Sequence, residues 1–320
     1  MYQYMIKSAK KKIDMFIMHM KGKQGKAPSR KNLSDSPYYI IRRNPPGAGF
    51  FSNYLYVASH ICYALEKGYK PVVDMENYET LYSENRPING TKNSWEYYYR
   101  QPKDVSLKEA YDSNDYILSG FDYHGEYMPF SETKGTFVLD KGQKLERLEE
   151  VISGYMMYNS TTEAVVNSKT AAIFDNLNGD EIIGVHVRGT DKRHENAGHY
   201  IAAQFDKYFG VIDEICKCNH VKKILICTDE EEAINAFKVK YREMIITTDS
   251  FKATQGNEEG LHFQNDVGIR ENHKYKLGLE VITDMELLTR CTYLVFGHSN
   301  VTNVALIKNN QNFKKTFFIA

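Results

Sequence analysis

The chain has 320 residues and a mass of 37.0 kDa, which favours two domains over a single core. Hydrophobic residues make up 42% and charged residues 26% of it, proportions that are ordinary for a globular protein and exclude a disordered one. Lys plus Arg and Asp plus Glu both number 41, so the net charge is zero, and no nucleic-acid partner is expected.

The charge is nevertheless uneven. Residues 1–31 contain nine basic residues and one acidic residue, so this end carries +8 and the remainder −8. Apolar residues recur with helical spacing over residues 1–21, and a basic amphipathic helix of this kind can lie on an anionic membrane surface. A frayed basic leader, or a helix packed on the body, would give the same pattern. We assign residues 1–35 to a basic leader and linker.

The cysteines and the apolar runs bear on the cellular compartment. Five cysteines are scattered along the chain, and Cys216 and Cys218 have the wrong spacing for a zinc knuckle. No apolar run approaches the roughly 18–20 residues of a spanning helix, and the amino end lacks the apolar core of a signal peptide. We expect a reduced, cytoplasmic chain, or one held at the inner face of the membrane by its basic end.

The first predicted domain spans residues 36–178. A strand over Tyr38–Arg43, a Gly-rich loop, a helix over Tyr54–Lys67 and a strand over Pro71–Met75 form the phosphate-binding unit of a Rossmann-like half. The dinucleotide fingerprint is incomplete, since its third glycine is missing after Gly49, and this disfavours a nicotinamide enzyme. The candidate donor-binding residues of this loop are Gly47, Gly49, Phe50 and Asn53.

The rest of this domain is less regular. Residues 76–143 are predicted to be irregular, with a short aromatic helix over residues 93–99 in which Trp95 serves as a core anchor or, alternatively, as a platform for a sugar. Residues 144–159 and 161–177 have helical spacing and lead into the second half.

The second predicted domain spans residues 179–320, and strands and helices alternate along it. Such alternation predicts a parallel sheet covered by helices on both faces. The strands are expected at residues 182–188, 223–228, 244–248, 293–297 and 316–319, and the helices at about 200–217, 230–241, 274–290 and 300–309.

Polar residues gather where these strands end. His186 and Arg188 alternate with Val185 and Val187, so both polar side chains should leave one face of the first strand just before it ends. The guanidinium suits an anion such as a diphosphate, or equally an internal carboxylate partner. Because open α/β sheets bind ligands outside the carboxyl ends of their strands, all these clusters should line one crevice. The other clusters contain Asp191, Thr228, Asp229, Thr248, Asp249, His298, Ser299 and Asn300.

Several of these segments together resemble a known family, the α1,6-fucosyltransferases, which include nodulation and core-fucosylating enzymes and have the O-fucosyltransferases as distant relatives. The resemblance spans roughly residues 38–320. It is carried, in order, by PPGAGFFSN, HVRGTDK, ENAGH, ICTDEEEAINAFK, GLHFQND and ITDMELLTRCTYLVFGHSNVTNVA.

The resemblance implies a GT-B-like α/β fold, in which two Rossmann-like domains face a cleft that holds GDP-fucose. It also implies transfer of fucose to a glycan acceptor with inversion and without a metal ion. The sequence agrees with the absence of a metal, because it contains no Asp-x-Asp motif and no cluster of His and carboxylates. The oligomeric state is left open.

The resemblance also implies roles for individual residues. Arg188 would bind the β-phosphate and His186 would lie against the nucleoside. Asp284 would accept from the paired N–H donors of guanine, against the alternative of an ordinary helix-surface charge. The other donor contacts would be made by Thr228, Asp229, Ser299 and Asn300, with simple N-capping as the alternative for Ser299.

Glu195 aligns with the general base of the family, and Asp191 is its rival. The loop between them is one residue shorter than in the core-fucosylating members, and Gly189 replaces a second Arg. A coiled coil and an SH3-like domain of those members have no counterpart here, so the acceptor is expected to differ. Two alternative functions stay open: a transferase for another GDP-sugar, and a sugar-nucleotide-binding protein without catalysis.

Overall fold

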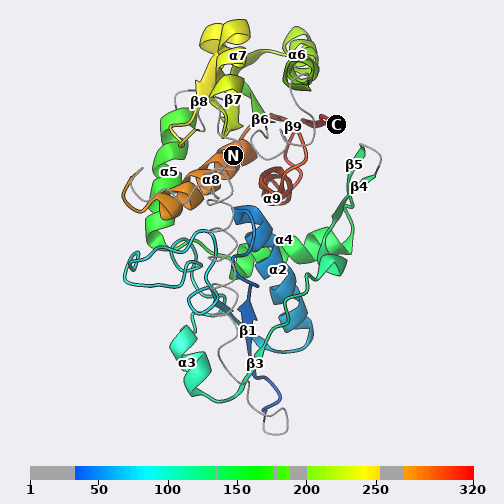
Figure 1. Cartoon of the computed structure of the whole chain (residues 1–320). Coiled ribbons are helices and arrows are strands. Elements are labelled where there is room, and N and C mark those ends of the chain that lie inside the picture. Colours follow the sequence, from blue (N-terminus) through cyan, green and yellow to red (C-terminus); the bar gives the residue numbers. More distant parts are fainter. Residues whose placement is uncertain (1–32, 134–135, 176, 178, 188–199, 253–269) are drawn as a thin grey trace, which may run out of the picture. The chain divides into compact units, whose positions relative to one another are not determined.

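The structure is a computed structural model, and it describes residues 33–133, 136–175, 177, 179–187, 200–252 and 270–320. The chain divides into two compact units (Figure 1). The described part of unit 1 is residues 33–128 and 141–162, and unit 2 consists of residues 129–140 and 163–320. The division therefore falls within a helix at residues 162 and 163, before the predicted boundary at 178 and 179. The basic leader lies almost wholly in residues 1–32, outside the described residues.

Unit 1 is built on a three-stranded parallel sheet with the order β2-β1-β3. Its central strand is β1, and the long helix α2 buries twelve of its seventeen residues. Because α2 begins at Phe50, it starts four residues before the predicted helix. The elements are β1 (Tyr38–Arg42), α2 (Phe50–Glu66), β2 (Lys70–Asp74), α3 (Leu107–Asp112), β3 (Tyr116–Leu118), the 3-10 turn η2 (Gly125–Tyr127) and α4 (Gln143–Tyr155).

Two local predictions for unit 1 were wrong. Residues 76–143 are not irregular throughout, since they contain α3, β3 and a hairpin of strands. Residues 93–99 form a hydrogen-bonded turn instead of a helix, with the N–H groups of Tyr98 and Tyr99 both donating to the carbonyl of Trp95. Trp95 is 3% exposed and stacks on Tyr99 at 4.5 Å between ring centroids, so its side chain is a core anchor as expected.

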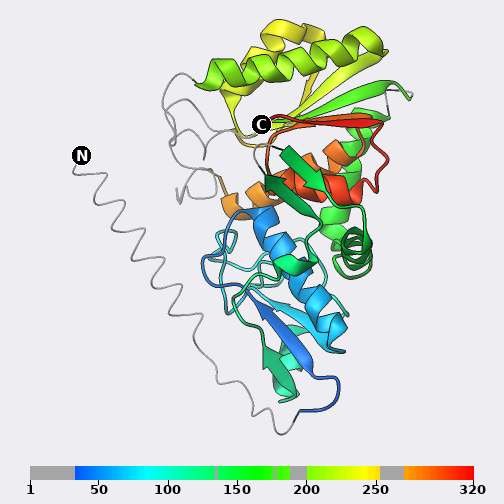
Figure 2. The ribbon, with the colours of Figure 1, turned by 90° about the vertical axis from the view of Figure 1, so that its right-hand side faces the viewer.

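Unit 2 contains a five-stranded sheet with the order β10-β9-β6-β7-β8, and every pair in it is parallel. Figure 2 shows α6 and α7 on one face of this sheet and α5, α8 and α9 on the other. The alternation predicted from the sequence is confirmed. The elements are α5 (Ser160–Phe174), β6 (Glu181–Val187), α6 (Tyr200–Cys218), β7 (Val221–Thr228), α7 (Glu231–Tyr241), η4 (Arg242–Met244), β8 (Ile245–Thr247), α8 (His273–Thr289), β9 (Tyr293–Phe296), α9 (Asn300–Lys308) and β10 (Lys315–Phe318).

The two faces of β6 meet different layers, as its alternating pattern predicts. Val185 and Val187 pack into the core shared with α6 and α7. Gly184 faces α8, where an added Cβ would lie 2.9 Å from the Cys291 sulfur, so this helix can approach the sheet closely only because the residue is glycine. His186 therefore shares the α8 face of the sheet.

A two-stranded hairpin, β4 (Phe130–Thr133) and β5 (Thr136–Leu139), is inserted in sequence between the two stretches of unit 1 but belongs to unit 2. Phe137 packs edge-on against Phe296 of β9 at 5.4 Å and lies 5.6 Å from Phe318 of β10. The hairpin thereby adds aromatic area to the edge of the five-stranded sheet, which the sequence pattern did not reveal.

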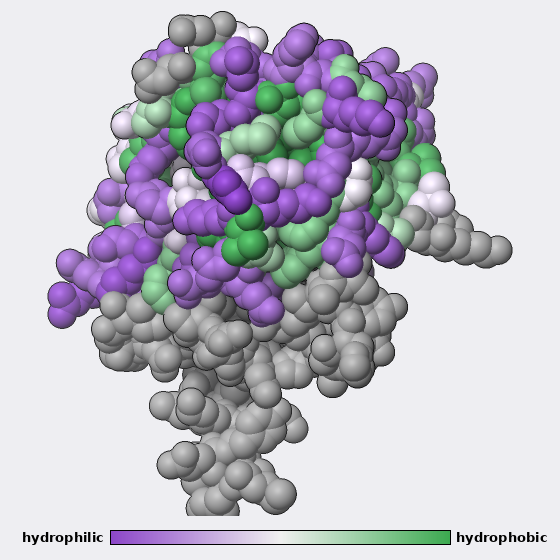
Figure 3. Space-filling view, turned by 90° about the horizontal axis from the view of Figure 1, so that it is seen from above, coloured by the Kyte–Doolittle hydropathy of each residue, from purple (hydrophilic) through white to green (hydrophobic). Residues whose placement is uncertain are grey.

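The outer surface of unit 2 is mixed in character. Viewed from the side of α6 and α7, Figure 3 shows hydrophilic and hydrophobic residues interspersed over the described surface. The most exposed large apolar side chain is Val239 on α7, at 81%. None of the helices described is long and apolar enough to cross a bilayer.

Candidate functional site

The carboxyl edge of the five-stranded sheet contains a topological switch point. From β6 the chain continues through β7 to β8 on one side, whereas β9 and β10 pair on the other side. Open parallel sheets bind ligands at the carboxyl ends of strands where the order reverses in this way. The ends of β6 and β9 are therefore the expected centre of a ligand site, and the predicted residues His186 and Ser299 lie at these ends.

The three predicted catalytic residues, Arg188, Asp191 and Glu195, lie in residues 188–199, outside the described residues. The strand that precedes them is described to its last residue. His186, its penultimate residue, is 8% exposed, and the Tyr208 hydroxyl of α6 donates to its carbonyl oxygen at 3.2 Å.

The β6 and β7 strands connect His186 with the predicted guanine ligand, Asp284. His186 pairs with Cys227 of β7 in the sheet register, and the Cys227 thiol lies 3.6 Å from the Asp284 carbonyl oxygen. Thr228 follows Cys227 and is 4% exposed, with its carbonyl oxygen accepting from Lys252 Nζ at 2.7 Å. Asp229 comes directly after the strand. The structure thus brings His186, Thr228 and Asp284 into one neighbourhood of unit 2.

The start of α9 fits the alternative that the sequence left open for Ser299. The Ser299 hydroxyl caps the helix by accepting from the Val301 N–H at 3.2 Å. The Asn300 side-chain oxygen accepts from Asn303 at 3.2 Å. Both side chains therefore have structural partners, and a phosphate contact by either residue remains a prediction.

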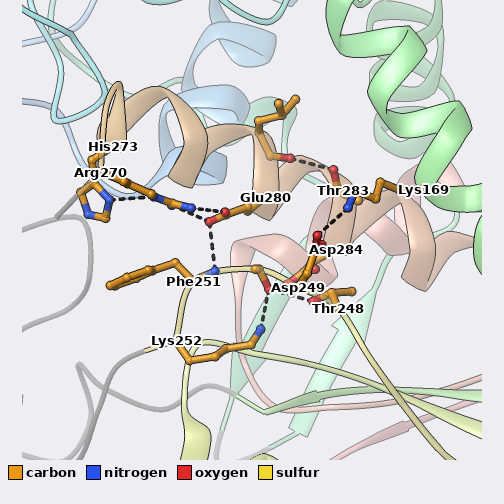
Figure 4. Close-up of polar contacts among 12 residues, drawn as sticks. Lys169, Thr248, Asp249, Phe251, Lys252, Arg270, His273, Glu280, Thr283 and Asp284 are labelled. Atoms are coloured by element: carbon orange, nitrogen blue, oxygen red, sulfur yellow. Dashed lines mark hydrogen bonds and ion pairs between the residues drawn. The ribbon is translucent and has the colours of Figure 1, made fainter.

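Asp284 lies in a pocket of about 170 Å³ between α5, α8 and the segment that follows β8. Figure 4 shows its carboxylate beside Thr248 and Lys252. Ser250 Oγ donates to Asp284 Oδ2 at 3.4 Å, while Oδ1 is buried and has no hydrogen-bond partner among the described residues. The pocket is lined by Val165, Lys169, Thr248, Asp249, Ser250, Lys276, Leu279, Glu280, Thr283 and Asp284.

The environment of Asp284 changes its acidity. Burial raises the pKa of this carboxyl to about 6, because desolvation disfavours the charged form. The Lys252 ammonium and the Thr248 and Ser250 hydroxyls act in the opposite direction. A buried carboxylate oxygen without a donor is costly, so the pocket favours a ligand that brings N–H groups.

A second carboxylate on the same helix holds the wall of this pocket in place. Glu280 lies one turn before Asp284, on the same face of α8. Arg270 donates to its two oxygens, Nη1 to Oε1 at 2.5 Å and Nη2 to Oε2 at 2.9 Å, and the Phe251 N–H donates to Oε2 at 3.2 Å (Figure 4). The sequence analysis missed this pair, although the four-residue spacing of Glu280 and Asp284 was available as a signal.

The Gly-rich loop of unit 1 shows structural roles for its predicted donor-binding residues. Gly47 has φ +74°, and a Cβ there would lie 2.9 Å from Asn53 Oδ1. Asn53 holds the loop on α2, since its side chain accepts from the Ala48 N–H and donates to the Ala48 carbonyl, both at 3.0 Å. Phe50 packs edge-on against Tyr82 at 5.1 Å. Around Gly49 there is open space, so the loop leaves room for a ligand at that residue.

Metal ligation finds no support in the part of the chain that the structure describes. No group of three or more His, Cys, Asp or Glu side chains is assembled there as a metal ion requires. Metal-independent chemistry remains a prediction.

Comparison with solved structures identifies the class of fold. The fold is similar to two structures of the fucosyltransferase NodZ from Bradyrhizobium, with TM-scores of 0.52 and 0.51, identities of 15% and 16%, and coverage of 85% of this chain and 92% of NodZ. It is also similar to a variant of FUT1 from Arabidopsis thaliana in complex with GDP, with a TM-score of 0.50, 13% identity, and coverage of 97% and 78%. The fold is therefore the GT-B-like α/β fold predicted from the sequence.

The sequence comparison finds a family that matches part of the chain. Residues 148–306, a little under half of the chain, match the family described as alpha-(1,6)-fucosyltransferase N- and catalytic domains. This region, which includes β6, the Asp284 pocket and the start of α9, is similar to the α1,6-fucosyltransferase family. No curated protein matches it in sequence.

Proposed function

We propose that this protein is an inverting, metal-independent glycosyltransferase that moves fucose from GDP-fucose to a hydroxyl group of a glycan acceptor, in the cytoplasm or at the inner face of the membrane. Three lines support the proposal: the family match over residues 148–306, the similar folds of fucosyltransferases, and the pocket around Asp284.

The observation that carries the proposal is the buried Oδ1 of Asp284, which has no hydrogen-bond partner among the described residues, next to an Oδ2 that accepts from Ser250 at 3.4 Å. Guanine presents N1–H and the exocyclic amine side by side, so one carboxylate can accept from both. Uracil offers one N–H between two carbonyl acceptors. Setting a buried carboxylate against acceptors costs a few kcal/mol, enough for about a hundredfold preference for guanine.

The chemistry of fucosyl transfer indicates roles for the other predicted residues. Negative charge develops on the departing GDP, and the Arg188 guanidinium would meet it with two parallel hydrogen bonds to the β-phosphate. The amino end of α9 suits such a diphosphate. Glu195 would remove the proton of the acceptor hydroxyl, which attacks the sugar carbon from the side opposite the leaving group and inverts it.

Thermal unfolding with nucleotides is the decisive experiment. GDP should raise the melting temperature of the protein, UDP should not, and Asp284→Asn should abolish the protection by GDP. Asp249→Asn is the matched control, because Asp249 lines the same pocket but is exposed and paired with Lys169 at 2.5 Å. Equal protection by GDP and UDP would refute the role of Asp284.

Turnover then separates the remaining alternatives. GDP-fucose should be consumed in the presence of an acceptor and of EDTA. Turnover of GDP-mannose in its place would indicate a transferase for another GDP-sugar. Tight binding of GDP without turnover of any GDP-sugar would indicate a sugar-nucleotide-binding protein, and loss of activity in EDTA, restored by Mn²⁺, would reveal a metal site.

A further inference from the structure

Unit 1 has its own topological switch point, and an arginine lies at it. The chain leaves β1 for β2 on one side, whereas β3 pairs with β1 on the other side. Arg43 follows the last residue of β1, and the segment after β3 leads to Tyr123. The carboxyl ends of β1 and β3 are therefore where a parallel sheet of this order binds a ligand.

The neighbouring arginine, Arg42, has a structural role at this end of the sheet. Arg42 Nε donates to the Ser119 carbonyl at 2.8 Å, and its Nη1 donates to the Tyr78 hydroxyl at 2.9 Å. The group also lies over the Phe121 ring, 4.6 Å from its centroid. Arg42 thus joins β1 to the segment after β3 through two hydrogen bonds within the protein.

Arg43 differs from Arg42 in its hydrogen bonding. Its Nε is buried and has no hydrogen-bond partner among the described residues, and none of the described carboxylates forms an ion pair with it. Its guanidinium lies over the Tyr56 ring at 4.3 Å from the centroid. The side-chain stem packs beside Gly47, where a Cβ would lie 3.3 Å from Arg43 Cγ.

The rings around Arg43 form a rigid platform. Tyr56 is fully buried, and its hydroxyl donates to the carbonyls of Arg42 and Gly120 at 2.9 and 3.1 Å, which ties the ends of β1 and β3 together. Tyr123 stacks on Tyr56 with ring centroids 6.5 Å apart and is itself 46% exposed. The platform therefore presents an open aromatic ring beside a cation.

The electrostatics of this platform call for an anion. Burial lowers the pKa of Arg43, and the groups that act in the opposite direction are the Tyr56 and Tyr123 hydroxyls instead of a carboxylate. A guanidinium stays charged at every physiological pH, and the cation–π contact with Tyr56 offsets part of its desolvation here. An oxyanion with two oxygens would satisfy the guanidinium fork, and the ring of Tyr123 would accept the apolar face of a sugar.

We propose that Arg43, Tyr56 and Tyr123 form a subsite for an oxyanion carried by the sugar acceptor, either a carboxylate or a phosphate ester. The identity of the ligand as the sugar acceptor rests on the proposed function, whereas the anion subsite itself is argued from unit 1 alone. The pocket of Asp284 is built wholly from unit 2 and the Arg43 subsite wholly from unit 1, so the two sites can be tested independently.

The test is ligand-observed saturation-transfer NMR on the full chain with three probes: methyl β-glucuronide, glucose 6-phosphate and the neutral methyl β-glucoside. At least one anionic probe should bind about tenfold more tightly than the neutral one, a difference of about 1.4 kcal/mol. Preference for the glucuronide identifies a carboxylate, and preference for glucose 6-phosphate identifies a phosphate ester. Equal binding of all three probes overturns the proposal.

Variants of Arg43 test whether this residue causes the preference for anionic sugars. Arg43→Met keeps the apolar stem and should remove the preference for anions, while Arg43→Lys, which keeps the charge without the fork, should retain part of it. Lys70→Met is the matched control, because Lys70 also lies over a tyrosine ring, that of Tyr38 at 5.3 Å, but at the amino end of the same sheet. An Arg43→Met protein that keeps the preference for anions would overturn the proposal.

The same variants distinguish this subsite from the donor site. Arg43→Met should leave the affinity for GDP within about twofold of the original protein. A loss of more than about tenfold in GDP affinity, with unchanged binding of the acidic sugars, would assign Arg43 to the donor diphosphate and overturn the proposal. Conversely, a protein that binds acidic sugars through Arg43 and does not bind GDP would refute the proposed function and leave the subsite standing.

Discussion

Ser250 donates to one oxygen of Asp284, at 3.4 Å, and the other oxygen of that carboxylate is buried without a hydrogen-bond partner among the described residues. Ser250 and Asp284 thus form a hydrogen-bonding arrangement in which one carboxylate oxygen still needs a donor. Ser250 comes from the segment after β8 and Asp284 from the middle of α8, so the arrangement exists only because the end of the sheet packs on this helix.

Guanosine binding should depend on pH through Asp284. The carboxylate form accepts from guanine and the protonated form does not. Because the pKa is about 6 in the empty pocket, affinity should be constant above about pH 7 and fall up to tenfold per pH unit below 6. Calorimetry with guanosine avoids the phosphate group of GDP, which also titrates in this range. A flat profile for the original protein between about pH 5 and 7 would contradict this role.

Asp284→Asn should stabilise the empty protein at neutral pH. The pKa of this carboxyl is raised in the folded state, so the folded chain binds the proton more tightly than the unfolded chain does. Its favourable contribution is complete below the unfolded pKa and is lost as the pH rises through about 6. Neutral Asn removes that loss, and we expect a gain on the order of 1–3 kcal/mol in the free energy of unfolding at pH 7.

Urea denaturation at pH 7 and pH 4 measures this effect, and the gain should shrink at the lower pH. Asp249→Asn serves as the comparison, since the Lys169 hydrogen bond lowers the pKa of Asp249 and its loss should not stabilise the protein. An Asp284→Asn protein that is less stable than the original at pH 7 would show that the carboxylate has a structural partner.

Gly47→Ala and Gly49→Ala should behave differently although the two glycines are two residues apart. Gly47 has φ +74° and lies against Asn53, so alanine there should destabilise unit 1 by about 2 kcal/mol. Gly49 has φ −56° and open space around its Cα, so alanine should leave stability unchanged.

Calorimetric titration of the Gly49→Ala protein with GDP then tests the loop. If the loop approaches the diphosphate, the added methyl should weaken GDP binding without changing the melting temperature. Unchanged GDP affinity in this protein would remove Gly49 from the donor site.

Arg188→Ala should reduce turnover by about 10³, the scale of deleting one charge stabiliser in a closed site. Arg188→Lys should be less severe but still strongly impaired, because lysine cannot hold two phosphate oxygens in a fixed geometry. Turnover of GDP-fucose is measured alongside the melting temperature to confirm folding. A folded Ala variant with near-original turnover would contradict the phosphate role.

Glu195→Gln should separate binding from chemistry. Gln keeps the size and one acceptor oxygen but cannot take a proton, so turnover should fall about 10²–10⁴ while GDP affinity stays within a few fold. Asp191→Asn is the comparison, since Asp191 is the rival base. Collapse of turnover in Asp191→Asn, with an active Glu195→Gln protein, would move the general base to Asp191.

The order of elements in unit 2 could be predicted from the sequence alone. Strands buried on both faces must be continuous apolar runs, and helices that cover them must be amphipathic, so residues 182–187 and the segments after them carry strong periodic signals. From these strands it could also be predicted that the polar residues at the strand ends lie along one edge of the sheet, because parallel strands bring their carboxyl ends to one edge. The family resemblance also lies in these segments, and the match over residues 148–306 supports it.

Short or unusual elements could not be predicted. β3 has three residues, all half-buried, which is too short for a periodic signal, yet it completes the sheet of unit 1. The β4–β5 hairpin belongs to unit 2 through Phe137, and that contact joins residues far apart in the sequence. Likewise, the sequence alone indicated only that Asp284 was a helix residue of a known motif, whereas its raised pKa comes from burial in the folded protein.

Arg42 and Arg43 show what local sequence patterns could not predict. They are identical residues at adjacent positions after the same apolar run, so every local pattern treats them alike. Successive side chains of an extended chain point to opposite sides. One therefore meets Ser119 and Tyr78 and donates a hydrogen bond to each, and the other meets the Tyr56 ring and keeps a buried Nε without a partner among the described residues. The sequence determined that two cations end this strand, and the packing of α2 and of the segment after β3 decided which one is left for a ligand.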